Sequence, residues 1–251
     1  LNAPVLLTSS FLQLRRGAGA ELWAAAFGEV VYSPDAGSTW YDAPDLAGVE
    51  LLHRTPDGRL FGVGDAAIGE ISLPLGPVGL EYIPTLDGDT PTYSENNVVF
   101  GFAEANGTLI ASERFGRVAR APASGGPFQG DGQQLLGGEA ELLHLGDGRV
   151  VSFSTGGEVQ IACGPTDEFV VIGQAKPYPA VASNATQLVR APDGVLWAAS
   201  SDGLQRSCDD GQTWEDLADP DLSPVYDLSV GPDGFLWYVF PSGIVRLELP
   251  I

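Results

Sequence analysis

Short apolar runs recur along the whole chain, and each follows a tight turn. Six segments share this pattern: GAELWAAA (19–26), DGRLFGVG (57–64), NGTLIASE (106–113), DGRVVSFS (147–154), DGVLWAAS (193–200) and DGFLWYVF (233–240). One apolar residue marks each repeat, and successive marker residues lie 38 to 49 residues apart: Trp23, Phe61, Ile110, Val151, Trp197 and Trp237. Helical spacing of apolar residues is absent. The pattern therefore predicts an all-β protein built from one repeated unit.

Each of these turns lies between two runs that are typical of β-strands. Five of the six turns contain Asp-Gly or Asn-Gly, the dipeptides that supply the positive φ angles of a tight hairpin. A second glycine turn and a third strand follow, as in GEVVYS (28–33) and GIVRLE (243–248), and a fourth run completes most repeats. Four strands in a repeat of about 43 residues are typical of a β-propeller blade.

Six repeats predict a six-bladed β-propeller of four-stranded antiparallel blades, which forms a single domain over residues 1–251. The last repeat ends after its third strand, whereas the N-terminus carries a spare strand, APVLLTS (3–9). We expect this N-terminal strand to complete the last blade and close the ring, because closure removes exposed sheet edges. The blades are expected at residues 10–46, 47–84, 95–129, 138–173, 184–218, and 224–251 plus 3–9.

Two octapeptides, SPDAGSTW (33–40) and SCDDGQTW (207–214), share a second pattern after the third strand of their repeats. A carboxylate can accept hydrogen bonds from turn amides, and glycine allows a left-handed residue. The pattern resembles the Asp-box, or BNR repeat, of sialidase-like propellers. The resemblance implies structural turns on the rim away from the ligand-binding face. The matching residues are Ser33, Asp35, Gly37, Thr39 and Trp40, and Ser207, Asp209, Gly211, Thr213 and Trp214.

The resemblance does not extend to a sialidase catalytic set, which needs an arginine cluster, a tyrosine with a glutamate partner, and an aspartate. Arg114, Arg117 and Arg120 form a local run that is typical of an outer strand face. The only histidines, His53 and His144, each end an ELLH segment, two repeats apart. Repeated packing positions explain these histidines, and a catalytic pair is the alternative. We therefore predict no catalytic residue and leave enzymatic activity open.

Polar residues recur at the start of the innermost strand of the repeats, ten residues before the apolar marker residue. The second and third repeats join this pattern if their hairpins are one and three residues longer. The resulting candidate ligand-binding ring at the channel mouth is Gln13, Glu50, Asn97, Glu141, Gln187 and Asp227. Polar strand starts beside a solvated channel are the alternative explanation.

Part of this ring has the chemistry of a calcium site, because calcium takes six to eight oxygen ligands. The candidate metal ligands are Glu50, Asn97, Glu141 and Asp227. The candidate site resembles, in position only, the metal site of six-bladed lactonase-like propellers, which hold a metal in this region with Glu, Asn and Asp. These propellers share no motif with this chain. A metal-dependent hydrolase, lactonase- or glycosidase-like, is therefore the alternative to a binding protein.

The net charge of −21, with 33 acidic residues against 12 Lys and Arg, limits the partners. Such a surface repels phosphate backbones and anionic membranes, so nucleic acid and membrane binding are not expected. Cations and neutral ligands such as sugars fit better, and solubility alone is the simpler explanation of the charge. We predict a monomeric, non-catalytic binding module that takes a glycan or a protein ligand on its acidic top face.

No apolar run approaches the roughly 20 residues that span a bilayer. The chain begins at Leu1 and contains no Met. We therefore expect a secreted, periplasmic or cell-surface protein whose signal segment is not present in this chain. Cys163 and Cys208 occupy corresponding places in two repeats. Because bridged Cα atoms lie within about 7 Å, a disulfide between these places is left open.

Overall fold

The computed structural model describes the strands and most of the turns of the chain. The described residues are 13–16, 20–26, 29–35, 38–43, 49–54, 59–64, 67–71, 81–82, 99–124, 128–177, 188–200, 203–217, 225, 227–230, 235–240 and 243–247. Apart from β-strands, these ranges contain one short 3₁₀ turn, η2 (Arg114–Gly116). Within the same ranges, no helix has the length and apolar character needed to cross a bilayer.

Within the described residues the strands form six antiparallel sheets, which we number along the chain. Sheet 1 contains β1 (Gln13–Arg16), β2 (Leu22–Ala26), β3 (Glu29–Ser33) and β4 (Tyr41–Asp42). Sheet 2 contains β5 (Val49–Arg54), β6 (Leu60–Gly64), β7 (Ala67–Ile71) and β8 (Glu81–Tyr82). Sheet 3 contains β9 (Val99–Ala105), β10 (Thr108–Glu113), β11 (Arg117–Pro122) and β12 (Gln129–Gln134).

The second half of the chain repeats this organisation. Sheet 4 contains β13 (Ala140–His144), β14 (Val150–Ser154), β15 (Glu158–Ala162) and β16 (Val170–Gln174). Sheet 5 contains β17 (Leu188–Arg190), β18 (Leu196–Ser200), β19 (Gly203–Ser207) and β20 (Glu215–Leu217). Sheet 6 contains three described strands, β21 (Asp227–Val230), β22 (Leu236–Phe240) and β23 (Gly243–Leu247).

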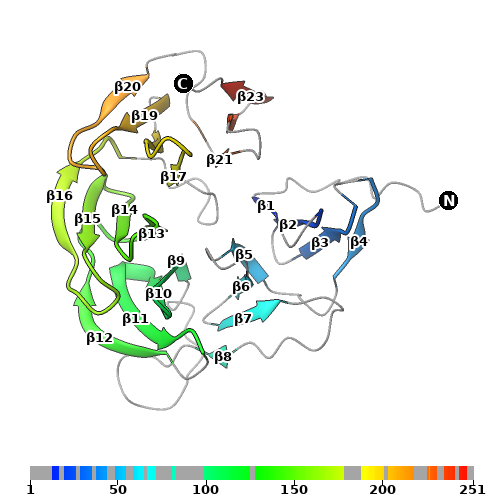
Figure 1. The fold of residues 1–251 in the computed structure, drawn as a ribbon, viewed down its shortest axis with the longest axis horizontal. Helices are drawn as coiled ribbons and strands as arrows, with labels where there is room; N and C mark the ends of the chain where they lie inside the picture. Colours follow the sequence, from blue (N-terminus) through cyan, green and yellow to red (C-terminus); the bar gives the residue numbers. More distant parts are fainter. Residues whose placement is uncertain are drawn as a thin grey trace.

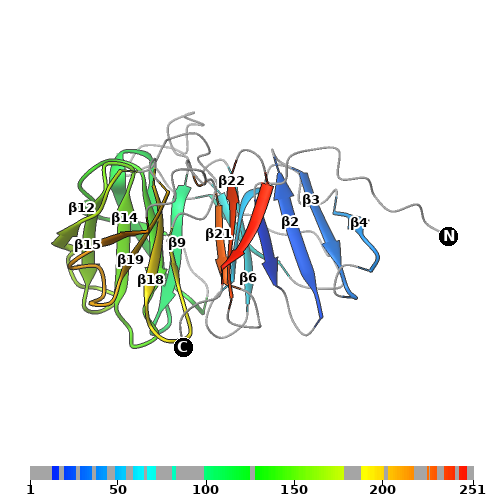
Figure 2. The same ribbon diagram turned by 90° about the horizontal axis from the view of Figure 1, so that it is seen from above.

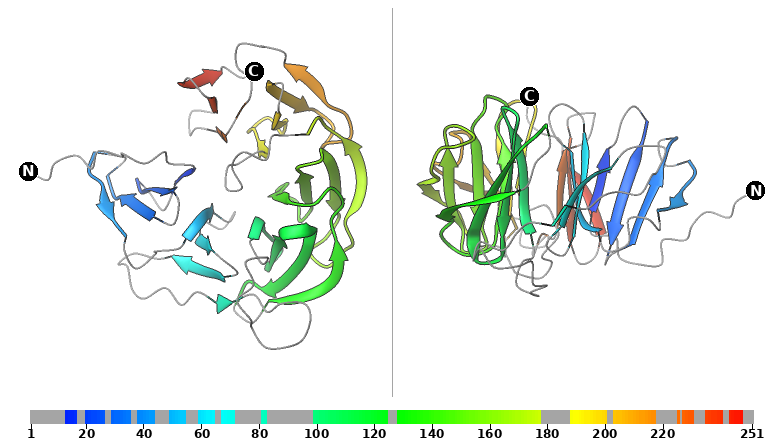
Figure 3. Two further views of the ribbon diagram at one scale, coloured as in Figure 1. Left: turned by 180° about the vertical axis from the view of Figure 1, so that it is seen from behind. Right: turned by 90° about the horizontal axis from the view of Figure 1, so that it is seen from below.

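The sheets lie around a common centre, as in a propeller. Strand order within each sheet follows the chain, and the first strand of each sheet lies nearest the centre (Figure 1). From the side the strands run across the thickness of a disc (Figure 2), and the view from behind shows the same arrangement (Figure 3). The predicted all-β, propeller-like fold is therefore confirmed. Residues 3–9 lie outside the described residues, so closure of the ring by this segment stays a prediction.

The hydrophobic core is divided among the spaces between neighbouring sheets. Between sheets 2 and 3, for example, Phe61 packs on Phe102 with ring centroids 5.2 Å apart. Between sheets 4 and 5, Phe153 of β14 belongs to one cluster with Leu188 and Leu196. Second strands such as β14 and β18 are buried at every position, since both faces of a middle sheet are covered. This explains why their sequences are apolar or small throughout rather than alternating.

The hairpins between first and second strands use their Asn-Gly and Asp-Gly pairs in two different ways. In the Asn106–Gly107 turn both residues have positive φ, 48° and 79°, as the sequence predicts. In the Asp-Gly turns after β13 and β17, the left-handed residues are glycines only, so the prediction for aspartate is wrong there. Instead, the Asp147 and Asp193 carboxylates accept hydrogen bonds from the backbone two residues later, at 3.1 and 3.0 Å.

Candidate functional site at the start of the inner strands

Three of the predicted ring residues occupy one equivalent place in the fold. Gln13 opens β1, Asp227 opens β21 and Glu141 is the second residue of β13. In the strand register they lie opposite Ala25, Val239 and Phe153, each of which follows the marker residue of its repeat by two positions. These inner strands lie around the centre of the molecule (Figure 1), so the three backbone positions occupy equivalent places around it.

The register does not reproduce the extra hairpin lengths that brought Glu50 and Asn97 into the ring. In sheet 2, Leu51 lies opposite Val63 at the equivalent place, and Glu50 falls where the register shifts. In sheet 3 the equivalent place belongs to Gly101, opposite Ser112. The reason is that the strands pair without interruption from the hairpin to Leu51 and to Gly101, so neither hairpin contains the extra residues that the alignment assumed. The register shifts lie beyond these places, toward the starts of β5 and β9.

The ring's role in binding stays a prediction, because most of its side chains are not described. Asn97 and Gln187 lie outside the described residues, and only the backbone is described for Gln13, Glu50 and Asp227. Among the described residues there is no cluster of three or more His, Cys, Asp or Glu side chains that could hold a metal. Calcium binding by Glu50, Asn97, Glu141 and Asp227 therefore stays a prediction.

Glu141 is the ring member with a described side chain, and it is used to join two sheets. The half-buried Glu141 Oε2 accepts a 2.9 Å hydrogen bond from the backbone N–H of Leu188, which opens β17 in the next sheet. A carboxylate at this place therefore satisfies a backbone donor of the neighbouring inner strand. At this position, the hydrogen bond supports the simpler explanation of the ring, in which the strand starts are polar without binding a ligand.

The two turns that resemble Asp-boxes lie at the other end of the sheets from the ring, as the resemblance implies. They join β3 to β4 and β19 to β20, and in antiparallel sheets these turns are opposite to the start of the first strand. Asp209 accepts hydrogen bonds from Ser207 Oγ and from Thr213 N and Oγ1 at 2.6 to 2.8 Å. These bonds to Thr213 lower the pKa of Asp209. Its carboxylate therefore serves the turn itself. Gly37 of the first turn lies outside the described residues.

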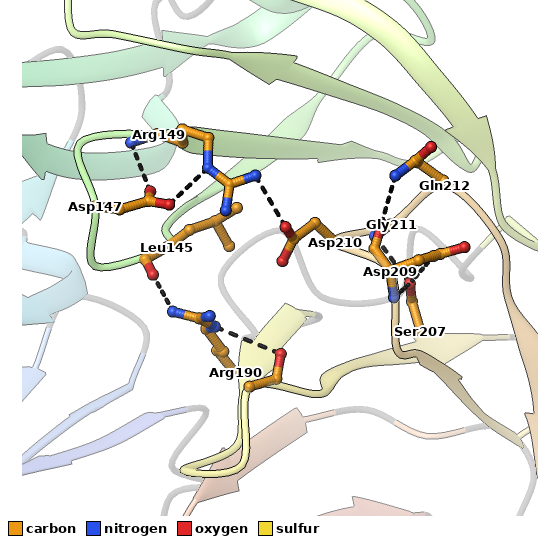
Figure 4. A network of polar contacts seen from close by, with 10 residues as sticks. Leu145, Asp147, Arg149, Arg190, Ser207, Asp209, Asp210, Gly211 and Gln212 are labelled. Atoms are coloured by element: carbon orange, nitrogen blue, oxygen red, sulfur yellow. Dashed lines mark hydrogen bonds and ion pairs between the residues drawn. The ribbon is translucent and has the colours of Figure 1, made fainter.

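A polar network joins the second of these turns, at residues 207–214, to sheet 4 (Figure 4). Arg149 donates through Nη1 to Asp210 Oδ2 at 2.8 Å and through Nε to Asp147 Oδ2 at 2.7 Å. The hydrogen bonds that Arg149 donates to Asp147 and Asp210 raise its pKa. Nearby, Arg190 donates to the carbonyl of Leu145. The network connects the β13–β14 turn with sheet 5, which indicates a role in joining the sheets.

His144 and Arg120 both have partners within the fold. The Nε2 of His144 accepts a hydrogen bond from Gly148 N at 3.2 Å, and burial lowers the pKa of the imidazole, so the neutral ring is held in a turn. Only the backbone of His53 is described. Arg120 pairs with Asp131 and donates to the carbonyl of Asp167 at 3.0 Å. Arg120 thus has structural partners.

Cys163 and Cys208 are both exposed, and both carry free thiols in the structure. They lie in the β15–β16 and β19–β20 turns, at corresponding rim positions of neighbouring sheets. The bridge that the sequence left open is therefore not formed here.

The sequence interpretation missed Glu113, the last residue of β10. Its side chain is only 2% exposed, and its Oε1 has no hydrogen-bond partner among the described residues. Burial raises the pKa of this carboxyl, while the charge of Arg117 acts in the opposite direction. The available signal was an acidic residue at the end of an apolar strand, in the segment NGTLIASE (106–113).

Comparison with known proteins supports the fold and goes no further. No family model and no curated protein matches the chain. The extracellular domain of BT4673 from B. thetaiotaomicron is 13% identical, with a TM-score of 0.69 over 96% of this chain and 35% of that chain. This chain thus spans about a third of that longer protein.

Two enzymes have a similar fold at a similarly low identity. A streptogramin B lyase structure is 15% identical, with a TM-score of 0.69 over 100% of this chain and 86% of the lyase. A gluconolactonase, XC5397 from Xanthomonas campestris, is 15% identical, with a TM-score of 0.65 over 92% of this chain and 82% of the other. The TM-scores show that the chain shares the β-propeller fold of these proteins. Identities of 15% do not show that it shares their activities.

Proposed function

We propose that the chain is a non-catalytic binding module that takes a glycan or a protein ligand on the face where the inner strands begin. The observation that carries this proposal is the strand register, which gives Gln13, Glu141 and Asp227 one equivalent place in three sheets around the centre. Polar residues at equivalent starts of inner strands are suited to orient a ligand on this face. Gln187 shares the same spacing in the sequence and is expected to belong to this ring.

The proposed scaffold is a six-bladed Asp-box propeller over residues 1–251, with residues 3–9 as the fourth strand of the last blade. Sheet 6 has three described strands where each of the other sheets has four, which leaves an outer edge for this N-terminal segment. Pairing there would cover an edge that is otherwise open to association. The complete Ser-Asp-Thr hydrogen bonding of both turns supports the Asp-box assignment.

We place the module outside the cytoplasm, as a monomer. Its likeness to an extracellular domain supports this location, as does the low number of Lys and Arg residues, 12 in all. The net charge of −21 disfavours nucleic acid and anionic membrane surfaces as partners. A neutral glycan or a protein with a basic surface fits this charge best.

A metal-dependent hydrolase centred on the ring is the second candidate. Its support is the likeness in fold to the gluconolactonase, together with carboxylates on three inner strands, at Glu50, Glu141 and Asp227. Asn97 would be a further oxygen ligand, and calcium is the expected metal because all four ligands are oxygen donors. The two candidates differ in whether the ring must hold a metal.

Substitution at the ring separates the two candidates. Asp227→Asn removes a charge, whereas Glu141→Gln removes a charge and keeps an oxygen that can accept from Leu188 N–H. Calcium titration by calorimetry, lactone hydrolysis and a glycan array are measured on the wild type and both variants. The binding proposal expects a ligand on the array that both variants weaken, without hydrolysis. Saturable calcium binding with hydrolysis that Asp227→Asn abolishes would establish the hydrolase instead.

A further inference from the structure

The repeat itself shows that Glu113 is unusual. In the strand register the last residue of each second strand occupies one equivalent place: Ala26, Gly64, Glu113, Ser154, Ser200 and Phe240. In sheet 4, Ser154 Oγ donates to Glu158 Oε2 at 2.7 Å, and in sheet 5, Ser200 Oγ donates to the carbonyl of Gly203 at 3.0 Å. At this place sheets 4 and 5 thus use a small hydroxyl to close the following turn. Sheet 3 has a carboxyl there instead.

Burial of the Glu113 carboxyl lowers the stability of the fold. A polar group that leaves water without a compensating hydrogen bond is unfavourable, and an ionised one more so. Glu113 Oε1 is in this situation among the described residues, and burial raises its pKa. A serine, as in the next two sheets, would avoid this cost. An expensive buried carboxyl at a place where the repeat tolerates small residues indicates a selected function.

The turn that follows Glu113 is strained and displays an aromatic ring. Phe115 has φ 69° and ψ 14°, a left-handed conformation that is rare for bulky residues, and it is 53% exposed. The turn is held by hydrogen bonds from Gln134 Nε2 to the Phe115 carbonyl, 2.9 Å, and from Leu135 N to the Gly116 carbonyl, 2.7 Å. More than half of the Phe115 side chain stays exposed, so burial of the ring offsets only part of the strain.

A second exposed apolar side chain, that of Leu136, follows directly on the segment that holds the turn. Leu136 is 55% exposed, and its neighbour Leu135 is bonded to Gly116. In the antiparallel sheet, the turn after β10 lies at the end where the inner strand β9 begins. Two exposed apolar groups and one buried carboxyl therefore belong to adjoining segments at the predicted ligand face.

The charge of the site selects the ligand. A carboxyl within a protein of net charge −21 disfavours anions, and a single carboxyl supplies too few oxygens for calcium. A protonated amine brings both the compensating charge and hydrogen-bond donors, and an aromatic face attracts such a cation. We propose that Glu113, Phe115 and Leu136 form a binding subsite for an organic ammonium ion with an apolar body, opened by relaxation of the strained Phe115 turn.

This subsite is separate from the proposed ring and does not require it. The probe is phenethylammonium, with the neutral 2-phenylethanol as its matched analogue, and binding to the full chain is followed by NMR titration. We expect saturable binding of the amine that Glu113→Gln weakens about tenfold or more, the factor expected for a lost charge-assisted contact. Glu168→Gln, an exposed acid in the β15–β16 turn, makes the same change in net charge and should leave the affinity unchanged.

Two further measurements distinguish recognition from a general effect on folding. Phe115→Asn removes the ring but keeps a residue that tolerates the left-handed conformation, so it should weaken amine binding several-fold without altering the circular dichroism spectrum. Amine affinity should fall as the pH is lowered through the raised pKa of Glu113, because protonation removes the charge. Gln13→Ala tests the ring separately and should not change amine binding.

The proposal is overturned if the wild type shows no saturable amine binding, or if Glu113→Gln binds the amine as well as the wild type does. Equal affinity for the alcohol would also overturn it, because that outcome would indicate an apolar or sugar-like ligand without a role for charge. Loss of amine binding in Gln13→Ala alone would overturn it too, by assigning the amine to the ring.

Discussion

The turns at residues 33–40 and 207–214 share the same hydrogen bonds among their Ser, Asp and Thr residues, and the second turn has further contacts with its neighbouring sheet. In each, the aspartate carboxylate accepts a hydrogen bond of 2.8 Å from the serine hydroxyl. It also accepts from the threonine N–H, at 2.7 Å in the first turn and 2.8 Å in the second, and from the threonine hydroxyl at 2.7 and 2.6 Å. Three local side chains are therefore enough to define the turn.

The second turn has additional contacts with the neighbouring sheet. Trp214 stacks on Phe153 of β14 with ring centroids 6.0 Å apart, and Asp210 pairs with Arg149 (Figure 4). The first turn has Ala36 where the second has Asp210, so it cannot form this ion pair. The difference teaches that the Ser, Asp and Thr residues shape the turn, whereas the variable residue after the aspartate helps to decide whether the turn also joins two sheets.

The largest effect is expected where the second turn packs on sheet 4, at Gly173 of β16. A Cβ at this position would lie 2.2 Å from the carbonyl oxygen of Gly211 and 2.8 Å from that of Gln212. Both neighbours are backbone atoms, so Gly173→Ala must separate the turn from the sheet. We expect a loss of about 3 kcal/mol in the free energy of unfolding, measured by urea denaturation.

A matched substitution controls for the general effect of adding a methyl group. In Gly164→Ala the new Cβ would lie 3.1 Å from a flexible carboxylate, that of Asp167, which can move. This variant should lose much less stability. If Gly173→Ala and Gly164→Ala are equally stable, the turn is not packed on sheet 4 as described.

Removal of the aspartate should have the next largest effect, and it should differ between the two turns. Asp209→Ala removes the acceptor of three hydrogen bonds, two from the exposed Thr213 and one from the buried Ser207. We therefore expect a cost of about 2 kcal/mol. Loss of the second turn's shape would also disturb the contacts of Asp210 and Trp214 with sheet 4. Asp35→Ala breaks the same local bonds without disturbing such contacts, so it should lower the free energy of unfolding by less. Equal losses in urea denaturation would mean that the attachments of the second turn contribute nothing.

The pH dependence of the same variants tests the charge of these carboxylates. Hydrogen bonds from Thr39 and Thr213 lower the pKa of Asp35 and Asp209 from the ordinary value of 3.8. A folded-state pKa below the unfolded value stabilises the protein above pH 3.8, and this contribution is lost as the pH falls through the lowered pKa. The stability difference between wild type and Asp209→Asn should therefore shrink on acidification. A constant difference would show that the charge is not involved.

Local sequence patterns predicted much of the fold, because hairpins and Asp-box turns depend on residues close in the chain. The Asn106–Gly107 turn and the Ser207, Asp209 and Thr213 bonds are examples. The position of Glu50 at a register shift and the burial of Glu113 depend instead on strand pairing and on packing between sheets. The use of Glu141 as an acceptor for Leu188 likewise requires the spacing of two inner strands, which no local pattern contains.

The smallest effect is expected for the ion pair that distinguishes the two turns. The Arg149 and Asp210 side chains are 30% and 31% exposed, so water and salt weaken their attraction. A double-mutant cycle of Arg149→Met and Asp210→Ala should give a coupling of about 0.5–1 kcal/mol in the free energy of unfolding, which decreases at high salt.

Transfer of this aspartate to the first turn, as Ala36→Asp, is the converse experiment. Sheet 6, the neighbour in the proposed ring, has Phe235 at the place of Arg149, after the same Asp-Gly pair. The new carboxylate would therefore meet no arginine, and we expect no gain in stability. A gain as large as the measured Arg149–Asp210 coupling would mean that the carboxylate stabilises the turn locally, and that the contrast between the two turns does not arise from the contact between sheets.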